Sequence, residues 1–209
     1  MIELHTFSTP NGRKASIALE EMEIPYSVHT VNIMEDDQFD PAFLAISPNN
    51  KIPAIVDGER ELSLMESGAI LFYLATKTGK FLPADPHEYW QCMEWLFWQV
   101  GGYGPMLGQA NHFLTFNQGK SDYAEERYGT EAQRLYRVLD SHLSENDYLA
   151  GSQYSIADMA TWPWTASFKM QKIDLADYPN VHRWYLEIAQ RPAVQRGYSV
   201  PKEAEIPLP

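Results

Sequence analysis

The first eighty residues alternate between strand-like and helix-like spacing of apolar side chains. Residues 2–7 (IELHTF) and 26–32 (YSVHTVN) alternate along the chain with a period of two, which predicts two strands. Between them, after a break at residues 8–12 (STPNG), apolar positions recur at helical spacing at Ala15, Ala18, Leu19 and Met22. The chain therefore begins with a predicted β-α-β unit.

The pattern from residue 41 onward predicts a short helix, two strands and a longer helix. Residues 41–46 form the short helix, and the β-branched run 51–56 forms a strand in which Pro53 cannot donate a ladder hydrogen bond. A turn at Asp57-Gly58 leads to a strand over 61–64, and helical spacing then starts at Ser67. The expected order of the first unit is β-α-β-α-β-β-α.

Turn-forming residues over 79–86 (GKFLPADP) predict a linker, so we expect domains at 1–78 and 87–209. The second is predicted to be entirely helical. Its expected elements are a tryptophan-rich helix that stops or kinks at 101–105, a long helix from about Asp122, a helix capped by Ser155 with Asp158 three residues on, and a last helix over 179–190 that Arg191-Pro192 ends. The proline-rich tail from residue 201 is expected to be extended.

The amino-acid composition limits the kinds of molecule that this protein is expected to bind. Among 209 residues, 16 are basic and 28 acidic, and the net charge of -12 argues against nucleic acid and anionic membranes. No apolar run approaches the ~18 residues of a membrane span, and the N-terminus lacks the pattern of a signal peptide, so a cytoplasmic protein is expected. The single cysteine, Cys92, excludes an internal disulfide and is expected to be a buried small residue.

The stretch from Ser47 to Ser67 contains the groups that are best suited to bind a ligand. If the bond before Pro53 is cis, the Ile52 N–H and C=O turn outward and are free for an extended ligand. Ser67 begins a helix, where backbone N–H groups bind anions, and Glu66 beside it can hold an ammonium group. A γ-glutamyl peptide offers an amide, a carboxylate and an amine. Alternatively, Pro53 merely opens an edge strand, and Glu66-Ser67 is only a helix cap.

With these residues in place, the chain resembles the cytosolic glutathione transferases over essentially its full length. The matching motifs are residues 8–12 (STPNG), 48–55 (PNNKIPAI, with the family's cis-proline position), 66–70 (ESGAI), 155–158 (SIAD) and 191–194 (RPAV). Residues 95–109 (WLFWQVGGYGPMLGQ) resemble the bacterial nu class, which is related to a nitrogen regulator of yeast. The resemblance implies a thioredoxin-like first domain, a C-terminal helical bundle and a homodimer.

The resemblance also implies glutathione as co-substrate and reduction of small disulfides as the activity. It places glutathione contacts at Asn11, Gln38, Lys51, Ile52, Pro53, Glu66, Ser67 and Arg127. The assignment of Gln38 rests on the match of Gln38-Phe39 after an acidic loop. The assignment of Arg127 rests on the match of residues 126–128 (ERY). On residue type alone, Arg127 is as well explained as a solvated surface arginine.

The reacting thiol is expected to belong to glutathione. No tyrosine or cysteine occurs in residues 1–25, which leaves Thr9, Asn11 and, less favoured, Ser8 to stabilise a thiolate near a helix N-terminus. Turn and cap chemistry is the alternative for Thr9 and Asn11. The same ligand site would serve a transferase or peroxidase, or a non-catalytic regulatory protein. The six histidines share no metal-ligand spacing in the sequence, so no metal site is expected.

Overall fold

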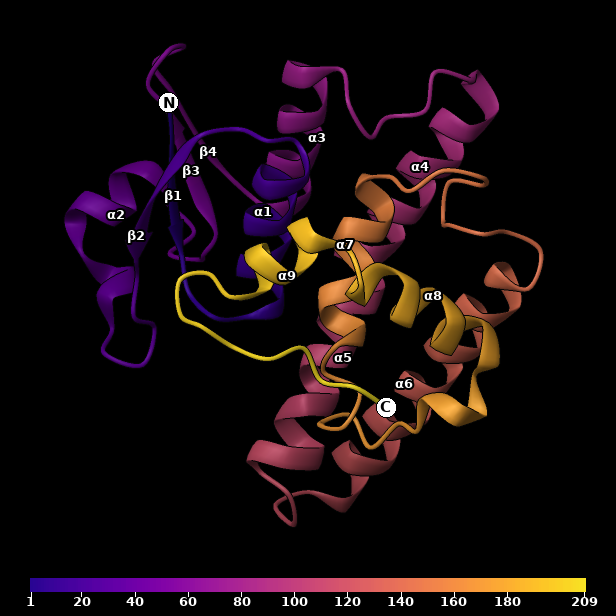
Figure 1. Ribbon diagram of the computed structural model, residues 1–209. Helices are drawn as coiled ribbons and strands as arrows, with labels where there is room; N and C mark the ends of the chain where they lie inside the picture. Colours follow the sequence, from indigo (N-terminus) through magenta and orange to yellow (C-terminus); the bar gives the residue numbers. More distant parts are fainter. The chain divides into compact units, whose positions relative to one another are not determined.

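The structure is a computed structural model that describes every residue, Met1–Pro209, and it divides into two compact units (Figure 1). The first comprises Met1–Lys80 and Gln190–Ile206, and the second comprises Phe81–Ala189 with Pro207–Pro209. The sequence had placed residues 190–206 with the helical domain. They group with the first unit because their helix packs on a helix of that unit.

A four-stranded mixed sheet forms the centre of the first unit. Its strands are β1 (Ile2–Thr6), β2 (Tyr26–Thr30), β3 (Ala54–Asp57) and β4 (Leu62–Met65), arranged in the order β2-β1-β3-β4. Strand β1 pairs parallel with β2 and antiparallel with β3, and β3 pairs antiparallel with β4. The predicted β-α-β-α-β-β-α order and the thioredoxin-like arrangement are confirmed.

Helices cover the two faces of this sheet differently. Alternate residues of β1, namely Ile2, Leu4 and Thr6, are fully buried on the face covered by α1 (Pro10–Glu21) and α3 (Ser67–Thr78) (Figure 1). Glu3 and His5 point to the other face, where the short helix α2 (Pro41–Ile46) follows the turn η1 (Asp37–Phe39). That second face is only partly covered.

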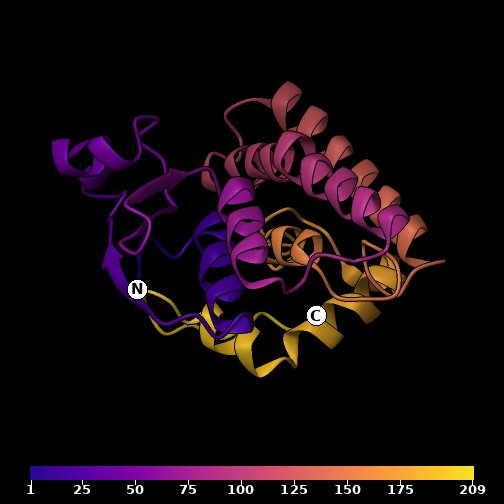
Figure 2. The same cartoon turned by 90° about the horizontal axis from the view of Figure 1, so that it is seen from above.

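The sequence analysis missed a helix, α9 (Pro192–Tyr198), and wrongly made the preceding helix the last one. Arg191-Pro192 looked like a stop signal, but Pro192 occupies the first turn of a new helix, where its missing N–H is harmless. Figure 2 shows this C-terminal helix, in yellow, beside the indigo helix α1. Arg191 makes a two-bond ion pair with Glu21, at 2.6 and 2.8 Å, so the helix start is fixed to α1.

The second unit is helical, as predicted. Its elements are α4 (Pro86–Trp98), the π-helical turn η2 (Gln99–Tyr103), α5 (Gly104–Asn111), a second π-helical turn η3 (His112–Phe116), α6 (Asp122–Leu143), α7 (Ile156–Thr165), the 3-10 turn η4 (Leu175–Asp177) and α8 (Pro179–Ala189). The predicted interruption at 101–105 is thus a π-helical turn between two helices. No helix of the chain combines the length and the apolar composition needed to cross a membrane.

Asp158 fixes the start of α7 at the centre of this unit. The capping box between Ser155 and Asp158 is confirmed. The fully buried Asp158 carboxylate also accepts hydrogen bonds from the Leu149 N–H at 3.0 Å and the Trp184 Nε1–H at 2.9 Å. Burial raises the pKa of Asp158 to about 6, against the hydrogen bonds that favour its charged form. Its function is therefore structural.

Candidate functional site

A pocket of about 210 Å³ lies in the first unit, where the segment before β3 meets the start of α3. It brings together six of the residues expected from the sequence. The lining residues are Asn11, Ser47, Asn49, Lys51, Ile52, Pro53, Met65, Glu66 and Ser67. Residues that are far apart along the chain therefore converge on one cavity, which makes it the candidate site.

The segment before β3 presents a free backbone pair at this pocket. The Ser47 hydroxyl donates to the Lys51 carbonyl at 2.8 Å and holds the loop closed. The Ile52–Pro53 peptide bond is cis, and β3 begins only at Ala54. Neither the N–H nor the C=O of Ile52 has a hydrogen-bond partner within the protein. Both groups are available to pair with the backbone of an extended ligand.

The start of α3 supplies an anion site beside an acid. Glu66 is exposed and has φ +71°, a conformation that side-chain-bearing residues seldom adopt. The helix's first internal bond runs from the Ile70 N–H to the Glu66 carbonyl at 2.9 Å, so the N–H groups of residues 67–69 remain without a partner. They and the Ser67 hydroxyl can bind a carboxylate, while the Glu66 side chain can bind an ammonium group.

Lys14 lies directly behind this anion site, and the sequence analysis did not identify it. Its side chain is 1% exposed, and Nζ donates to Ser67 Oγ at 3.2 Å. Burial lowers the pKa of Lys14 to about 7, although Glu66 acts in the opposite direction. The signal was present in the sequence: Lys14 precedes Ala18 by four residues and so lies on the buried stripe of α1. A buried lysine reinforces the preference of the site for an anion.

Asn11 reaches the pocket because α1 begins very close to the end of β1. The Thr9 side chain caps α1 by accepting a hydrogen bond from the Gly12 N–H at 3.1 Å. A Cβ at Gly12 would lie 2.2 Å from the Phe7 carbonyl oxygen, so only glycine permits this approach. Thr9 therefore caps α1, as the alternative interpretation expected, and it also lies at a helix N-terminus, as predicted.

Three expected site residues are not among those that line the pocket. Thr9 lies at the cap just described. Gln38 belongs to η1, where Nε2 donates to Asp36 Oδ1 at 3.2 Å, while its Oε1 is buried without a partner. Arg127 is an exposed residue of α6 in the second unit. Cys92 is fully buried, as expected, and burial raises the pKa of its thiol, which makes it a poor nucleophile.

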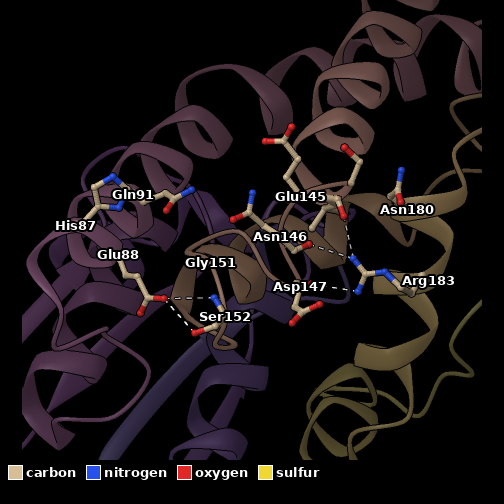
Figure 3. Close-up of a pocket in the computed structure, with 12 residues that line it drawn as sticks. His87, Glu88, Gln91, Glu145, Asn146, Asp147, Gly151, Ser152, Asn180 and Arg183 are labelled. Atoms are coloured by element: carbon tan, nitrogen blue, oxygen red, sulfur yellow. Dashed lines mark hydrogen bonds between the residues drawn. The ribbon is translucent and has the colours of Figure 1, made fainter.

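A larger pocket of about 550 Å³ lies in the second unit and contains none of the expected residues (Figure 3). Its lining is polar, and two of its charged side chains, Arg183 and Glu88, already have partners. Arg183 donates to the carbonyls of Leu143, Asn146 and Asp147 at 3.0, 3.1 and 3.4 Å. Glu88 accepts from the Ser152 hydroxyl at 3.0 Å. Arg183 thus ties α8 to the end of α6, and Glu88 ties α4 to the loop before α7, and we assign this pocket no function.

Several known proteins are similar to this chain. The disulfide-bond oxidoreductase YfcG of Escherichia coli is 52% identical over 198 residues, which cover 92% of each chain. A glutathione transferase structure from Burkholderia graminis, with two glutathione molecules bound per subunit, is 41% identical with a TM-score of 0.90 and covers 97% of this chain and 89% of its own. A glutathione transferase from Pseudomonas putida, with one glutathione disulfide bound per subunit, is 39% identical with a TM-score of 0.89. The match covers 96% of this chain and 91% of that protein.

Family descriptions match both units. The N-terminal domain of glutathione S-transferase matches residues 4–81, and the C-terminal domain matches residues 90–192. Together with the confirmed fold, these matches account for almost the whole chain. The chain belongs to the glutathione S-transferase family.

Proposed function

We propose that this protein is a glutathione-dependent disulfide oxidoreductase, in which the reacting thiolate belongs to bound glutathione. The observation that carries the proposal is a pocket with partners for a γ-glutamyl peptide but no cysteine among its lining residues. The only cysteine of the chain, Cys92, is fully buried on α4. A relative that is 52% identical is a disulfide-bond oxidoreductase, which supports the same activity here.

Each end of glutathione has a complementary partner in the proposed complex. The Ile52 N–H and C=O pair with the cysteinyl backbone, and Pro53 and Lys51 flank that pair. The γ-glutamyl carboxylate binds at the Ser67 hydroxyl and the start of α3, backed by Lys14, and its ammonium group binds Glu66. We further propose contacts from Gln38 and from Arg127. In this assignment residues 1–78 hold glutathione, 79–86 form a linker and the helical domain begins at residue 87.

The proposed catalytic residues, Thr9 and Asn11, stabilise the thiolate. Free thiols have a pKa of about 8.5, so hydrogen-bond donors and a positive helix end are needed to favour the anion at neutral pH. The Thr9 oxygen accepts from Gly12 but its O–H remains able to donate, and Asn11 lines the pocket. Both side chains lie at the N-terminus of α1, whose partial positive charge adds to their effect.

The proposed reaction proceeds by two thiol–disulfide exchanges. The bound thiolate attacks one sulfur of a disulfide RSSR, which forms the mixed disulfide GSSR and releases RS⁻. A second glutathione thiolate then attacks the glutathionyl sulfur of GSSR, which gives GSSG and a second RS⁻. Each released thiolate takes up a proton from solvent or from an incoming thiol. Two glutathione molecules are thus oxidised for each disulfide reduced.

A coupled assay with glutathione and hydroxyethyl disulfide tests this function. We expect turnover by the purified protein and the same turnover by Cys92→Ala. Loss of a single donor to the thiolate in Asn11→Ala should lower turnover by about 10- to 100-fold. Abolition of turnover by Cys92→Ala, in a variant whose circular dichroism is unchanged, would show that the mechanism is wrong.

The same protein should be compared with chloro-dinitrobenzene and cumene hydroperoxide, because a transferase or peroxidase would use the same pocket. Faster turnover of either than of the disulfide would assign that activity instead. Glutathione binding with negligible turnover of all three would identify a regulatory protein.

We also propose a cytoplasmic homodimer. Trp90 and Phe97 of α4 are each 69% exposed, which is unusual for large apolar side chains in a monomer and supports a covered surface. Light scattering during size-exclusion chromatography should give twice the 23.9 kDa mass of one chain. A monomeric mass would contradict the dimer without affecting the glutathione site.

A further inference from the structure

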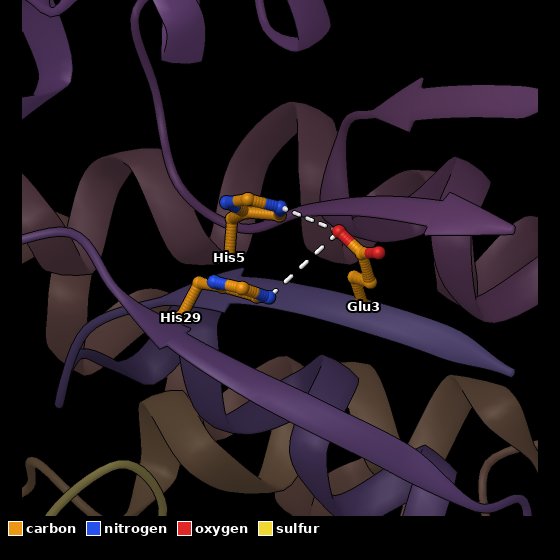
Figure 4. Close-up of side chains that lie close together, drawn as sticks. All are labelled: Glu3, His5 and His29. Carbon is orange, nitrogen blue, oxygen red and sulfur yellow. Dashed lines mark ion pairs between the residues drawn. The ribbon is translucent and has the colours of Figure 1, made fainter. Parts of the chain in front are cut away.

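A cluster of three potential metal ligands lies on the partly covered face of the sheet (Figure 4). His5 of β1 and His29 of β2 are direct neighbours in the parallel register, and their rings stack with centroids 4.6 Å apart and planes 11° apart. Glu3, two residues before His5, points to the same face. Its Oε2 lies 3.8 Å from Nε2 of His5 and 3.7 Å from Nε2 of His29.

The three side chains do not satisfy one another. Both nitrogen–oxygen distances exceed the range of a normal hydrogen bond, which ends near 3.2 Å. Nε2 of His5 is buried and has no hydrogen-bond partner. Two imidazole nitrogens therefore face one carboxylate oxygen at distances too long for a hydrogen bond.

The dimensions of the gap suit one metal ion after a small contraction. A tetrahedral ion with bonds of about 2.0–2.1 Å holds its ligand atoms about 3.4 Å apart. Here the ligand atoms of the three residues all lie within 4.8 Å of one another. His29 and Glu3 have side chains that are 50% and 47% exposed, so they can turn toward the ion, and the His29 ring can tilt out of its stack. His5 is 18% exposed and its ring lies 6.2 Å from that of Phe43, which fixes its position.

We propose that Glu3, His5 and His29 bind a divalent transition-metal ion such as Zn²⁺, with water at the remaining position. Two imidazoles and one carboxylate are typical ligands for Zn²⁺ and its neighbours in the transition series, whereas Mg²⁺ and Ca²⁺ prefer oxygen ligands. The ion joins two strands. Because β2 is at one edge of the sheet and pairs with β1 alone, this bond stabilises one of the two edge strands.

Isothermal titration with Zn²⁺ tests the site, using tag-free protein without glutathione, because polyhistidine tags and thiols also bind zinc. We expect one ion per chain for the wild type. His29→Asn should weaken binding by at least about 10-fold, since it removes one of three ligands. A higher melting temperature with Zn²⁺ but not with Mg²⁺ is expected for the wild type, and neither ion should affect His29→Asn.

His87→Asn is the matched control, because His87 is an exposed histidine of α4 outside the cluster. It should bind Zn²⁺ as the wild type does. With Co²⁺, the wild type and the control should give the visible absorption of a site with nitrogen and oxygen ligands, and Glu3→Gln should reduce it. Equal Zn²⁺ affinity in the wild type and His29→Asn, or no uptake by the wild type, would overturn the proposal. Since neither titration uses glutathione, these outcomes are independent of the proposed enzymatic function.

Discussion

The two pockets described above differ in a way that volume alone does not reveal. In the larger, about 550 Å³, Arg183 already donates to three backbone carbonyls and Glu88 accepts from Ser152. The smaller, about 210 Å³, is lined by backbone groups of Ile52 and of the start of α3 that have no partner in the protein. Unsatisfied polar groups next to a cavity are a better indication of a ligand site than the size of the cavity.

The largest expected difference between the two pockets comes from placing a negative charge in each of them. Ser67→Asp puts a carboxylate where the proposed ligand carboxylate binds, and we expect glutathione affinity to fall by more than about 100-fold, because two buried like charges repel. Ser144→Asp makes the same change in the larger pocket and should leave affinity unchanged. Calorimetric titration with glutathione measures both. A similar loss in the two variants would refute the assignment of the smaller pocket.

The second prediction concerns the close approach that brings Asn11 to the smaller pocket. Gly12→Ala forces a Cβ to within 2.2 Å of the Phe7 carbonyl oxygen and 2.5 Å of Thr6 Oγ1. We expect a loss of about 1–3 kcal/mol in the free energy of unfolding, typical of overpacking, together with weaker glutathione binding. Gly101→Ala is the control, since nothing lies within 4 Å of the added atom. Urea unfolding of both variants checks this, and equal stability would contradict it.

The third prediction concerns the pH dependence of stability. It tests the hydrogen bonds that link β3 to α3, the two elements beside the smaller pocket. Asp57 is fully buried, and hydrogen bonds from Lys77, Tyr73 and the Glu59 N–H outweigh the effect of burial and lower its pKa to about 2. A lowered folded-state pKa means that the carboxylate stabilises the fold above about pH 4 and loses this effect as the pH falls through 2.

Asp57→Asn should therefore reduce stability by about 2 kcal/mol at pH 7 and much less at pH 2. Thermal unfolding across this range measures the difference between the variant and the wild type. A difference that does not vary with pH would show that the charge of Asp57 is unimportant.

The smallest expected effect belongs to Lys14. Its folded-state pKa of about 7 lies below the ordinary 10.5, so the unfolded chain binds more protons between these values, and stability rises with pH across that window. Lys14→Met should remove this rise. It should also weaken glutathione binding by about 10-fold at pH 7, the loss expected for one charged hydrogen-bonding group. Unchanged affinity would show that Ser67 and the start of α3 are sufficient to bind the glutathione carboxylate without Lys14.

Local patterns in the sequence predicted most of the fold and part of the site. The periods of two and 3.6, the Ser155 cap and the Ser47–Ser67 stretch depend on neighbouring residues, so the sequence displays them directly. Lys14 was missed because lysine is normally solvated, and its burial depends on what packs over α1. The α9 helix was missed because Arg191-Pro192 is compatible with either the end or the start of a helix.

The His5–His29 cluster could not be predicted for a different reason. Its members are 24 positions apart, far from any spacing that a helix or a turn would create for metal ligands. They meet because two parallel strands pair in one register, and a shift of one residue would place the rings on opposite faces. Register depends on the whole sheet.

The packing of α9 on α1 has a consequence for how the protein is made. Gly197 lies so close to Ile17 that an added Cβ would be 2.6 Å from the Ile17 Cα, and the Ser16 hydroxyl donates to the Gly197 carbonyl at 2.7 Å. The N-terminal unit is thus incomplete until the last part of the chain has left the ribosome. At synthesis rates of about 5–20 residues per second, α1 waits on the order of ten seconds or more with this face uncovered. During that interval Ile17 and the Ser16 hydroxyl lack the partners that α9 gives them.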